Sequence, residues 1–539
     1  MQEKKQNNLE IKNEKAPKKS VTMANSLMLV MVATLLSKFM GFFREILTSN
    51  RLGATRTADI YMYCIMIAVT IFATLFDAIR TTYIPNYTKA QNKGGKKSSL
   101  YFTNNILNIV CLVTITLSVI GFILSPTIIS VFSRFKAEDY NMAVTILRAL
   151  FTTIIFQAAT NVYVGYLQAN GSFFIPGIIS LPYNVCIIIP LIFYDKVGLN
   201  GLIIGTVLSL VVQPLFLLPF SIKKGYRYSP RLKFNEPNTK NAIFASFPIM
   251  LSGAVQQINA VLDKALASSL VAGSIAALNY SNKLMVFVYS LFSISIATII
   301  YPQLSELSVK NKMPEFKKII NKSIGLLNIL LIPSSAALVI LSTPIIQLLF
   351  QHGIFDDNAT ILTSGTLIYY SIGILFYGYR DILNRAFYSM HDTKTPMINS
   401  VFAVALGVVL NLILVKVMNA NGLALATSLS AVFATVLLFI SFRKKVGSFG
   451  AKAIAFSLLK SITATAVMSV VFYFGHEYLS KIIPNPTEFL NQFLILAIVG
   501  IAGVLVYVLC LKLFKSEELE WGFDLLKSMI KNKSKKKAD

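Results

Sequence analysis

The sequence predicts an all-α polytopic membrane protein with fourteen transmembrane helices. Three observations predict this class. Of the 539 residues, 55% are hydrophobic and only 14% are charged, and the mean hydropathy of +0.64 lies outside the range of soluble globular proteins. Apolar runs long enough to cross a bilayer recur along the whole chain. The basic residues gather in every second segment between these runs.

A polar segment precedes the first apolar run. Residues 1–22 contain six lysines, and the run that follows is longer than the apolar part of a signal peptide. We therefore expect a tail followed by a retained first span. A bilayer core about 30 Å thick needs about 20 mostly apolar residues per helix. Such runs lie at roughly 23–47, 58–87, 101–126, 140–167, 174–194, 198–220, 241–266, 275–304, 323–345, 359–388, 396–415, 422–442, 453–475 and 489–511.

The basic residues predict the direction in which the chain crosses the membrane. The expected inner segments hold 34 of the 50 lysines and arginines, and the expected outer loops hold 7. This asymmetry follows the positive-inside rule and predicts that the N-terminal tail at 1–22 and the basic C-terminal tail at 512–539 are both cytoplasmic. Nucleic acid is excluded as a partner, because the cations are spread along one membrane face instead of forming one basic domain.

The chain contains an internal repeat. When the sequence is shifted by about 220 residues, prolines and their neighbours come into register in the same order. The matched prolines are Pro85 with Pro302, Pro126 with Pro344 and Pro176 with Pro396. Six spans repeat as six, which predicts two parallel repeats that form lobes around a central cavity. We expect an N-lobe at 23–222 and a C-lobe at 241–442, followed by two additional helices at 453–511.

Charged residues within the apolar runs are the candidate binding residues. Each costs about 2.5 to 3.5 kcal/mol at the centre of a lipid-facing helix, so we expect these side chains to face a cavity. Nine cations lie within the runs, and the five expected to line the cavity are Lys38, Arg44, Arg80, Lys264 and Lys283. Together they would favour an anion. Three acids, Glu45, Asp77 and Asp263, can pair with these cations or bind a coupling H⁺ or Na⁺.

Several of these charges also have a purely structural interpretation. Asp77 and Arg80 stand three residues apart and can pair with each other on one helix. Glu45 lies on the same helical face as Lys38 and can serve as its counter-ion. Three further cations lie near helix ends, where a long side chain can reach the membrane surface: Arg148, Arg385 and Lys460.

Catalytic and metal-binding patterns are missing from the sequence. The three histidines have no partnered nucleophile, and the four cysteines lie singly within apolar runs. The stretch "GGKKSS" at 94–99 lacks the Ser or Thr that follows the lysine in a phosphate-binding loop. We expect a transporter without a cofactor or a resident metal. It would be driven by an H⁺ or Na⁺ gradient, the membrane potential or the gradient of its substrate.

Four stretches resemble the MurJ (MviN) family of lipid II flippases, within the multidrug/oligosaccharidyl-lipid/polysaccharide (MOP) exporter superfamily. They are "SKFMGFFREILTSNRLGATRTADIY", "FDAIRTTYIPNYTKA", "LDKALASSLVAGSIAALNYSNKL" and "LFQHGIFDDNATILTSGTLIYYSIGILFYGYRDILNRAFYSMHDTKTPMIN". The similarity runs from about residue 25 to about 445. It implies two six-helix lobes around a cationic cavity for a pyrophosphate and sugar-peptide headgroup. The helices at 453–511 would form a groove for the undecaprenyl tail.

The resemblance also implies roles for single residues. Arg44 falls on a functional arginine of span 1, and Asp59 on an aspartate just after the first outer loop. Lys38 and Lys283 stand where other members often have arginine, which keeps the charge but loses the two-pronged fork for phosphate. Some members bind sodium through an acid of span 7. For such a site, Asp263 and Asn411 are the candidates here.

These implications lead to a functional hypothesis. We expect a flippase that moves lipid II, an undecaprenyl-pyrophosphate-linked disaccharide peptide, from the inner to the outer leaflet of the bacterial cytoplasmic membrane by alternating access. The alternatives are a flippase for another undecaprenyl-pyrophosphate glycan of capsule or O-antigen type, a multidrug cation antiporter, and a scaffold that recruits cell-wall enzymes. The cationic cavity disfavours the antiporter. We expect the protein to be a monomer. Its expected contacts are membrane lipids and cell-wall synthesis enzymes.

Overall fold

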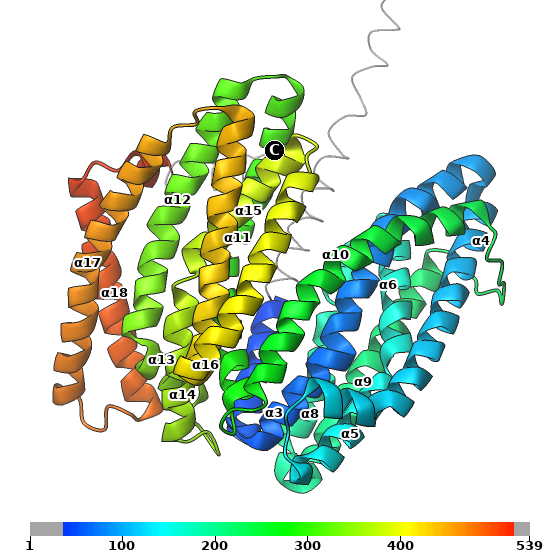
Figure 1. Cartoon of the computed structure of the whole chain (residues 1–539), viewed down its shortest axis with the longest axis horizontal. Coiled ribbons are helices and arrows are strands. Elements are labelled where there is room, and N and C mark those ends of the chain that lie inside the picture. The colour runs from blue at the N-terminus through cyan, green and yellow to red at the C-terminus, as the bar shows by residue number, and fades with distance from the viewer. Residues whose placement is uncertain (1–35, 522–539) are drawn as a thin grey trace, which may run out of the picture. The chain divides into compact units, whose positions relative to one another are not determined.

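The computed structural model describes residues 36–521 (Figure 1). The predicted tail at 1–22, the start of the first span and most of the tail at 512–539 lie outside these residues. Within the described part, every regular element is helical, as the sequence predicts. A helix at 36–52 comes first. It is followed by α3 (Arg56–Ile65), η1 (Met66–Thr70), α4 (Ile71–Phe132), α5 (Ala137–Phe151), α6 (Ile154–Ala169), α7 (Phe174–Gly177), α8 (Ser180–Ile192), α9 (Tyr194–Lys223), α10 (Pro237–Ala267), α11 (Ser274–Val309), α12 (Met313–Ile340), α13 (Ser342–Phe350), α14 (Asp357–Ser371), α15 (Ile374–Ser389), α16 (Lys394–Val446), α17 (Ala451–Ile482) and α18 (Phe489–Leu513).

Many of these helices are suited to a membrane. Among the described residues, eight helical segments are long and apolar enough to cross a bilayer, and α14 with α15, bent by 41°, makes a ninth. Two of the eight are far longer than one crossing needs. Arg56–Phe132 has 77 residues and Lys394–Val446 has 53, against about 20 for a single span. The number of fourteen crossings therefore stays a prediction.

Three of the long helices are interrupted close to expected loops. Within α4, Gly94 and Gly95 leave helical geometry, and Gly95 has a φ of 64°. In α9 the break is at Gly198, with a φ of 57°. In α16 it is at Asn419, with a φ of 52°. Glycine and asparagine adopt this left-handed conformation at little cost, which explains why the chain bends at these residues.

The described chain separates into two compact units. Unit 1 takes the chain up to Arg51, Tyr63–Val131 and Phe135–Gln257, and unit 2 takes Leu52–Met62, Phe132–Arg134 and the chain from Ile258. This division reflects packing. The lobe limits expected from the sequence repeat stay a prediction.

Unit 1 is built around buried tyrosines. The ring of Tyr87 stacks on Tyr83 and meets Tyr166 edge-on, and Tyr166 meets Tyr226 in the same way. The hydroxyl of Tyr83 lies 2.6 Å from that of Thr103. These contacts join α4, α6 and the segment after α9. Buried hydroxyls satisfied in this way fix the packing of helices whose surroundings are otherwise apolar.

Unit 2 contains α11 to α18, in which α17 packs beside α12 and α18 packs beside α17 and α13 (Figure 1). Their contact is an apolar cluster that includes Met468, Phe472 and Val499. Two polar side chains of α18 extend it: the Tyr507 hydroxyl donates to the Ile329 carbonyl at 2.9 Å, and Gln492 Nε2 donates to the Pro344 carbonyl at 3.0 Å. The additional C-terminal helices are thus fastened to the rest of unit 2.

Candidate functional site

Arg44 is the centre of a polar cluster in unit 1. It comes from the helix at 36–52, and its Nη1 donates to Oδ1 of Asn184 on α8 at 3.1 Å. Its Nη2 forms an ion pair with Glu45, and its guanidinium lies 5.4 Å from the ring centre of Tyr183. The side chains of Arg44 and Glu45 are only 17% and 7% exposed. A cation held on three sides in this way is oriented before any ligand arrives.

The other two candidates on this helix lie close to that cluster in sequence. Glu45 pairs with the residue directly before it, a contact that helical spacing alone does not predict because neighbouring positions point in different directions. Lys38 is half-buried, about one and a half turns before Arg44. Its binding role stays a prediction.

Asp77 and Arg80 form the predicted pair on α4. Arg80 Nη2 lies 3.3 Å from Asp77 Oδ1, and the side chains of Arg80 and Asp77 are 38% and 57% exposed, respectively. An exposed pair of this kind adds little to stability. Both groups keep open positions that a charged ligand can reach.

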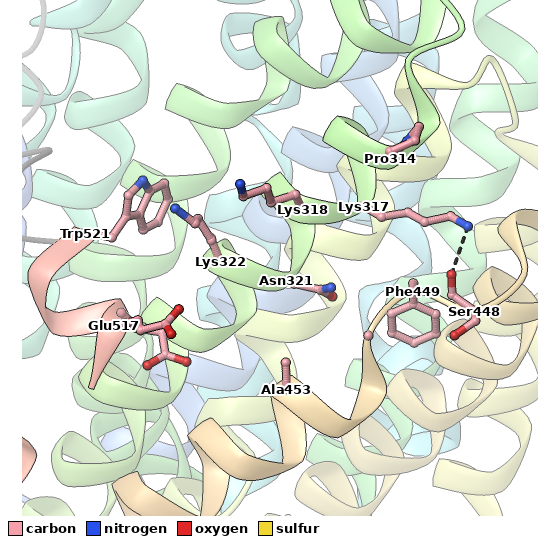
Figure 2. A pocket seen from close by; sticks show the side chains of 12 residues that line it. Pro314, Lys317, Lys318, Asn321, Lys322, Ser448, Phe449, Ala453, Glu517 and Trp521 are labelled. Atoms are coloured by element: carbon pink, nitrogen blue, oxygen red, sulfur yellow. Dashed lines mark hydrogen bonds between the residues drawn. The ribbon is translucent and has the colours of Figure 1, made fainter. Parts of the chain in front are cut away.

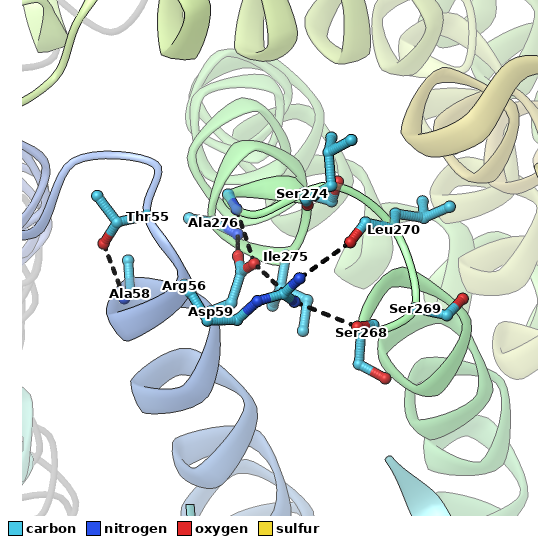
Figure 3. A network of polar contacts seen from close by, with 12 residues as sticks. Thr55, Arg56, Ala58, Asp59, Ser268, Ser269, Leu270, Ser274, Ile275 and Ala276 are labelled. Carbon is cyan, nitrogen blue, oxygen red and sulfur yellow. Dashed lines mark hydrogen bonds and ion pairs between the residues drawn. The ribbon is translucent and has the colours of Figure 1, made fainter. Parts of the chain in front are cut away.

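Asp59 joins two helix ends in unit 2 (Figure 3). It lies in the first turn of α3 and is fully buried. Its Oδ2 accepts the backbone N–H of Gly273 and its Oδ1 that of Ala276, both at 2.8 Å. These N–H groups belong to the start of α11 and have no partner within the helix. A carboxylate at a helix N-terminus is also favoured by the helix dipole.

Arg56 completes this network from the same turn. Its guanidinium donates to the carbonyls of Ser268 and Leu270 at 3.2 and 3.1 Å, and lies 3.7 Å from Asp59 Oδ2. The Ser268 and Leu270 carbonyls directly follow α10. The chain can approach so closely because Gly273 has a φ of 90°, and a Cβ there would lie 2.0 Å from the Ala54 carbonyl oxygen. The network fastens the turn between α10 and α11.

The two lysine candidates of unit 2 differ in their surroundings. Lys264, in the last turn of α10, donates to the Ile275 carbonyl at 3.4 Å and so lies beside the same turn as Asp59. Lys283 is half-buried on α11. The structure therefore brings Lys264 and Asp59 to one turn, and the binding role of all three residues stays a prediction.

Asp263 and Asn411 contact each other in unit 2. Asn411 Nδ2 of α16 donates to Asp263 Oδ1 of α10. One turn earlier on α10, Asn259 Oδ1 faces Gly407, one turn earlier on α16. Among the described residues, Oδ1 of Asn259 and Oδ1 of Asn411 are buried without a hydrogen-bond partner. Amide and carboxylate oxygens are ligands that hard cations prefer, so these residues supply the kind of donors that a cation site needs.

A pocket of about 410 Å³ opens in unit 2 near the start of α12 (Figure 2). Lys317 donates from one wall to the Ser448 carbonyl at 2.8 Å, and Lys322 lies 5.6 Å from the ring centre of Trp521. Lys318 completes three lysines on this side. None of the residues predicted to bind substrate or ions lines this pocket, which instead lies where the α16–α17 turn and the helix at 517–521 meet α12.

Sequence reasoning missed several polar partners. Asn184 and Tyr183 lie 140 and 139 positions from Arg44 along the chain, and Asn259 has no charge to draw attention to it. Asp381 of α15 was overlooked between Arg380 and Arg385, although it accepts hydrogen bonds from Tyr289 and Ser293 of α11. The available signal was the spacing of polar residues along α15.

Known proteins are similar to this chain in sequence and fold. A sequence model of the family described as "Lipid II flippase MurJ" matches residues 48–508. A probable lipid II flippase MurJ of Thermotoga maritima is 30% identical over 494 residues, which cover 91% of this chain and 96% of that protein. One of Borreliella burgdorferi is 26% identical over 490 residues, covering 90% and 95%.

Solved structures agree. The structure of "Lipid II flippase MurJ, inward closed conformation" superposes with a TM-score of 0.77 and 26% identity, and covers 90% of this chain and 98% of that one. An inward-facing multidrug resistance MATE family transporter of the MOP superfamily has a TM-score of 0.66 at 12% identity, covering 78% and 98%. The second likeness concerns the fold alone.

Proposed function

The chain belongs to the lipid II flippase MurJ family, and from this premise we propose that Arg44 holds the headgroup while the protein translocates lipid II. The family match spans residues 48–508 and is the observation that carries the function. The protein is an integral protein of the bacterial inner membrane, a transporter of lipid II in peptidoglycan biosynthesis.

The chemistry of Arg44 supports its assignment to the pyrophosphate. A guanidinium presents a planar fork of N–H donors that matches phosphate oxygens. Asn184 and Tyr183 restrict its orientation. Glu45 neutralises the charge of Arg44 in the absence of a ligand, and the anion replaces Glu45 as the partner of Arg44 when it binds. Exchange of a carboxylate for a phosphate avoids leaving the buried cation unpaired in either state.

The remaining predicted candidates are proposed as further contacts. Lys38, Arg80, Lys264 and Lys283 would add positive charge along the path of the headgroup, and Asp77 would release Arg80 as the ligand binds. For Asp59 we propose a positioning role at the turn before α11, because both of its oxygens already accept backbone N–H groups.

The transport cycle proposed here is alternating access. Fourteen spans arranged as two parallel six-helix repeats would form lobes that open in turn to the inner and the outer leaflet, with both chain ends in the cytoplasm. The two C-terminal helices, α17 and α18, would guide the undecaprenyl tail. We propose that the protein acts as a monomer and meets cell-wall synthesis enzymes at the membrane.

A coupling ion is proposed at Asp263. The unpartnered oxygens of Asn259 and Asn411 fit Na⁺ better than H⁺, because a proton would need only the carboxylate. Sodium entering this position would join α10 to the first part of α16 and so favour one conformation over another.

The function is tested by reconstitution. Full-length protein in vesicles should expose fluorescent lipid II at the outer leaflet, and Arg44→Gln should slow this at least about tenfold, since a charged hydrogen bond contributes about 1.5 kcal/mol or more. Arg148→Gln is the matched control, because within the described chain that arginine contacts the Phe122 carbonyl and ring. Equal rates for wild type and empty vesicles would contradict the function. Stronger competition by a capsule-type undecaprenyl-pyrophosphate glycan than by unlabelled lipid II would favour that alternative substrate.

A further inference from the structure

Helix α15 carries a continuous polar stripe. The α15 stripe is defined by six residues at alternating intervals of three and one: Tyr377, Arg380, Asp381, Asn384, Arg385 and Tyr388. Such intervals place all six side chains on one face of a helix. The opposite face is apolar, and Ile382, Leu383, Ala386 and Phe387 are fully buried. The stripe extends over roughly 16 Å at 1.5 Å per residue.

The carboxylate of the stripe is held by α11. Asp381 Oδ2 accepts a hydrogen bond from the Tyr289 hydroxyl and one from Ser293 Oγ at 3.3 Å. Tyr289 lies fifteen residues after the start of α11, roughly 22 Å along that helix. Tyr289 therefore lies near the middle of the span expected at 275–304. Both donors are neutral hydroxyls, so neither of them balances the charge of Asp381.

Two arginines flank this carboxylate, and both stack on tyrosines. The guanidinium of Arg380 lies 5.2 Å from the ring centre of Tyr377, and that of Arg385 lies 5.2 Å from the ring centre of Tyr301 on α11. Within residues 36–521 neither takes part in an ion pair or a hydrogen bond, and the Oδ1 atom of Asn384 is buried without a donor. Stacking on a tyrosine orients a guanidinium but leaves all of its N–H groups available.

Arg380 cannot be explained by snorkelling, because it lies nine residues before the end of α15, roughly 14 Å from it. Arg385 lies four residues before that end, and its side chain turns to a ring of the neighbouring helix. A charge as deep as that of Arg380 is costly against lipid, which favours a stripe that faces water or a ligand. Five of the six side chains are half-buried and Tyr388 is exposed, in agreement with a cavity wall that a ligand can reach.

The pattern of charges selects the ligand. A pyrophosphate needs cations only and is much shorter than the stripe. Arg380 and Arg385 are separated by a rise of about 7.5 Å along α15, with Asp381 between them in the sequence. Such a row of charges complements an extended group that carries carboxylates and an ammonium. Peptides have this chemistry. We infer that the α15 stripe binds the peptide part of the lipid II headgroup. This inference rests on the proposed function and assigns Arg380 and Arg385 to peptide carboxylates and Asp381 to a peptide amine.

Native mass spectrometry of the full-length protein tests this assignment with two probes, lipid II and lipid II from which the peptide has been removed. Arg380→Gln with Arg385→Gln should weaken lipid II binding about tenfold or more, and should leave binding of the peptide-free lipid unchanged. Arg44→Gln, as the contrasting variant, should weaken binding of both. A double Lys variant should recover part of the loss, because it restores charge without the fork.

Three outcomes would overturn the inference: an unchanged affinity for lipid II, an equal loss for both probes, or a loss in Arg148→Gln as large as in the double variant. Thermal unfolding of each variant separates loss of the ligand site from loss of the fold. If wild type bound lipid II no better than phosphatidylglycerol, the proposed function itself would fall.

Asp381 is tested with a third probe, lipid II whose peptide amine has been acetylated. Asp381→Asn keeps an oxygen that can accept from Tyr289 and removes only the charge. It should lower the affinity for lipid II about tenfold and leave the affinity for the acetylated form unchanged. Equal losses for both forms would remove Asp381 from the peptide site and leave it a positioning role between α11 and α15.

Discussion

Unit 2 contains two regions in which arginine and aspartate stand close together, and they are built in opposite ways. At the turn before α11, Asp59 is fully buried and accepts two backbone N–H groups, while Arg56 donates to two backbone carbonyls. On α15, Arg380 and Arg385 stack on tyrosines. The difference indicates that charged side chains bonded to the backbone stabilise the fold. Charged side chains whose N–H donors are not used within the protein are available to bind a ligand.

The largest expected effect is at Asp59. Asp59→Ala leaves two N–H groups and the Arg56 guanidinium without their buried partner, which should cost about 3 to 5 kcal/mol of folding free energy. Thermal unfolding in detergent and the yield of folded protein measure this. Arg380→Ala is the comparison and should change the unfolding temperature little. If Asp59→Ala unfolded like wild type but lost lipid II binding, the distinction between the two regions would fail.

The second largest effect is expected for Gly273→Ala, at the same turn before α11. Replacement by alanine forces a left-handed φ of 90° on a residue with a Cβ and drives that atom into the Ala54 carbonyl. We expect a loss of about 2 to 3 kcal/mol. Gly447, with a φ of 74° and no atom within 4 Å of the place that a Cβ would take, is the matched control, and its alanine variant should lose only about 1 kcal/mol. Equal losses would mean that the contact with Ala54 contributes nothing.

Asp263 lies between the two extremes, since it has one donor and unsatisfied oxygens nearby. We expect Na⁺ to stabilise the wild type relative to choline, by about 1.4 kcal/mol at ten times the dissociation constant. Asp263→Asn should remove this difference, and Asn259→Ala should reduce it. A sodium-independent unfolding temperature in the wild type would restrict Asp263 to a structural hydrogen bond.

The smallest effect is outside the membrane, at Asp392. Partial burial of this carboxyl raises its pKa, but hydrogen bonds from Lys445 and from Thr395 outweigh this and lower the pKa to about 2 from 3.8. The stabilisation is therefore complete above about pH 4 and is lost as the pH falls through 2. Because Lys445 is 37% exposed, we expect at most about 1 kcal/mol.

Asp392→Asn should accordingly lower the unfolding temperature slightly at pH 7, and the difference from wild type should disappear near pH 2. Glu306→Gln, which removes the exposed pair between the end of α11 and Lys310 directly after it, serves as the control and should produce no measurable change at either pH. A difference for Asp392→Asn that persisted at pH 2 would mean that its contribution is not ionic.

The sequence predicted the class of fold because hydropathy and the positions of basic residues depend on the bilayer, which acts on every span alike. The breaks at Gly94, Gly198 and Asn419 lie close to loops expected between the apolar runs. Arg44 stood out as a candidate because a charge lies within an apolar run, whereas its partner Asn184 was missed, because a hydrogen bond across 140 positions leaves no local pattern. The hydrogen bonds by which Asp59 caps the start of α11 were missed for the same reason. The spacing of polar residues along α15 is enough to define the stripe. It was not recognised as a site because it contains both basic and acidic side chains.

The wide turn η1, Met66–Thr70, separates α3 from α4. It contains one residue more than an α-helical turn needs, and one residue corresponds to about 100° of rotation. The side chains after it, such as those of Asp77 and Arg80, are therefore rotated about the helix axis relative to their positions in an unbroken helix from Tyr63. Deleting a single amino acid from this turn is a way to rotate the pair as a whole, without altering either charge.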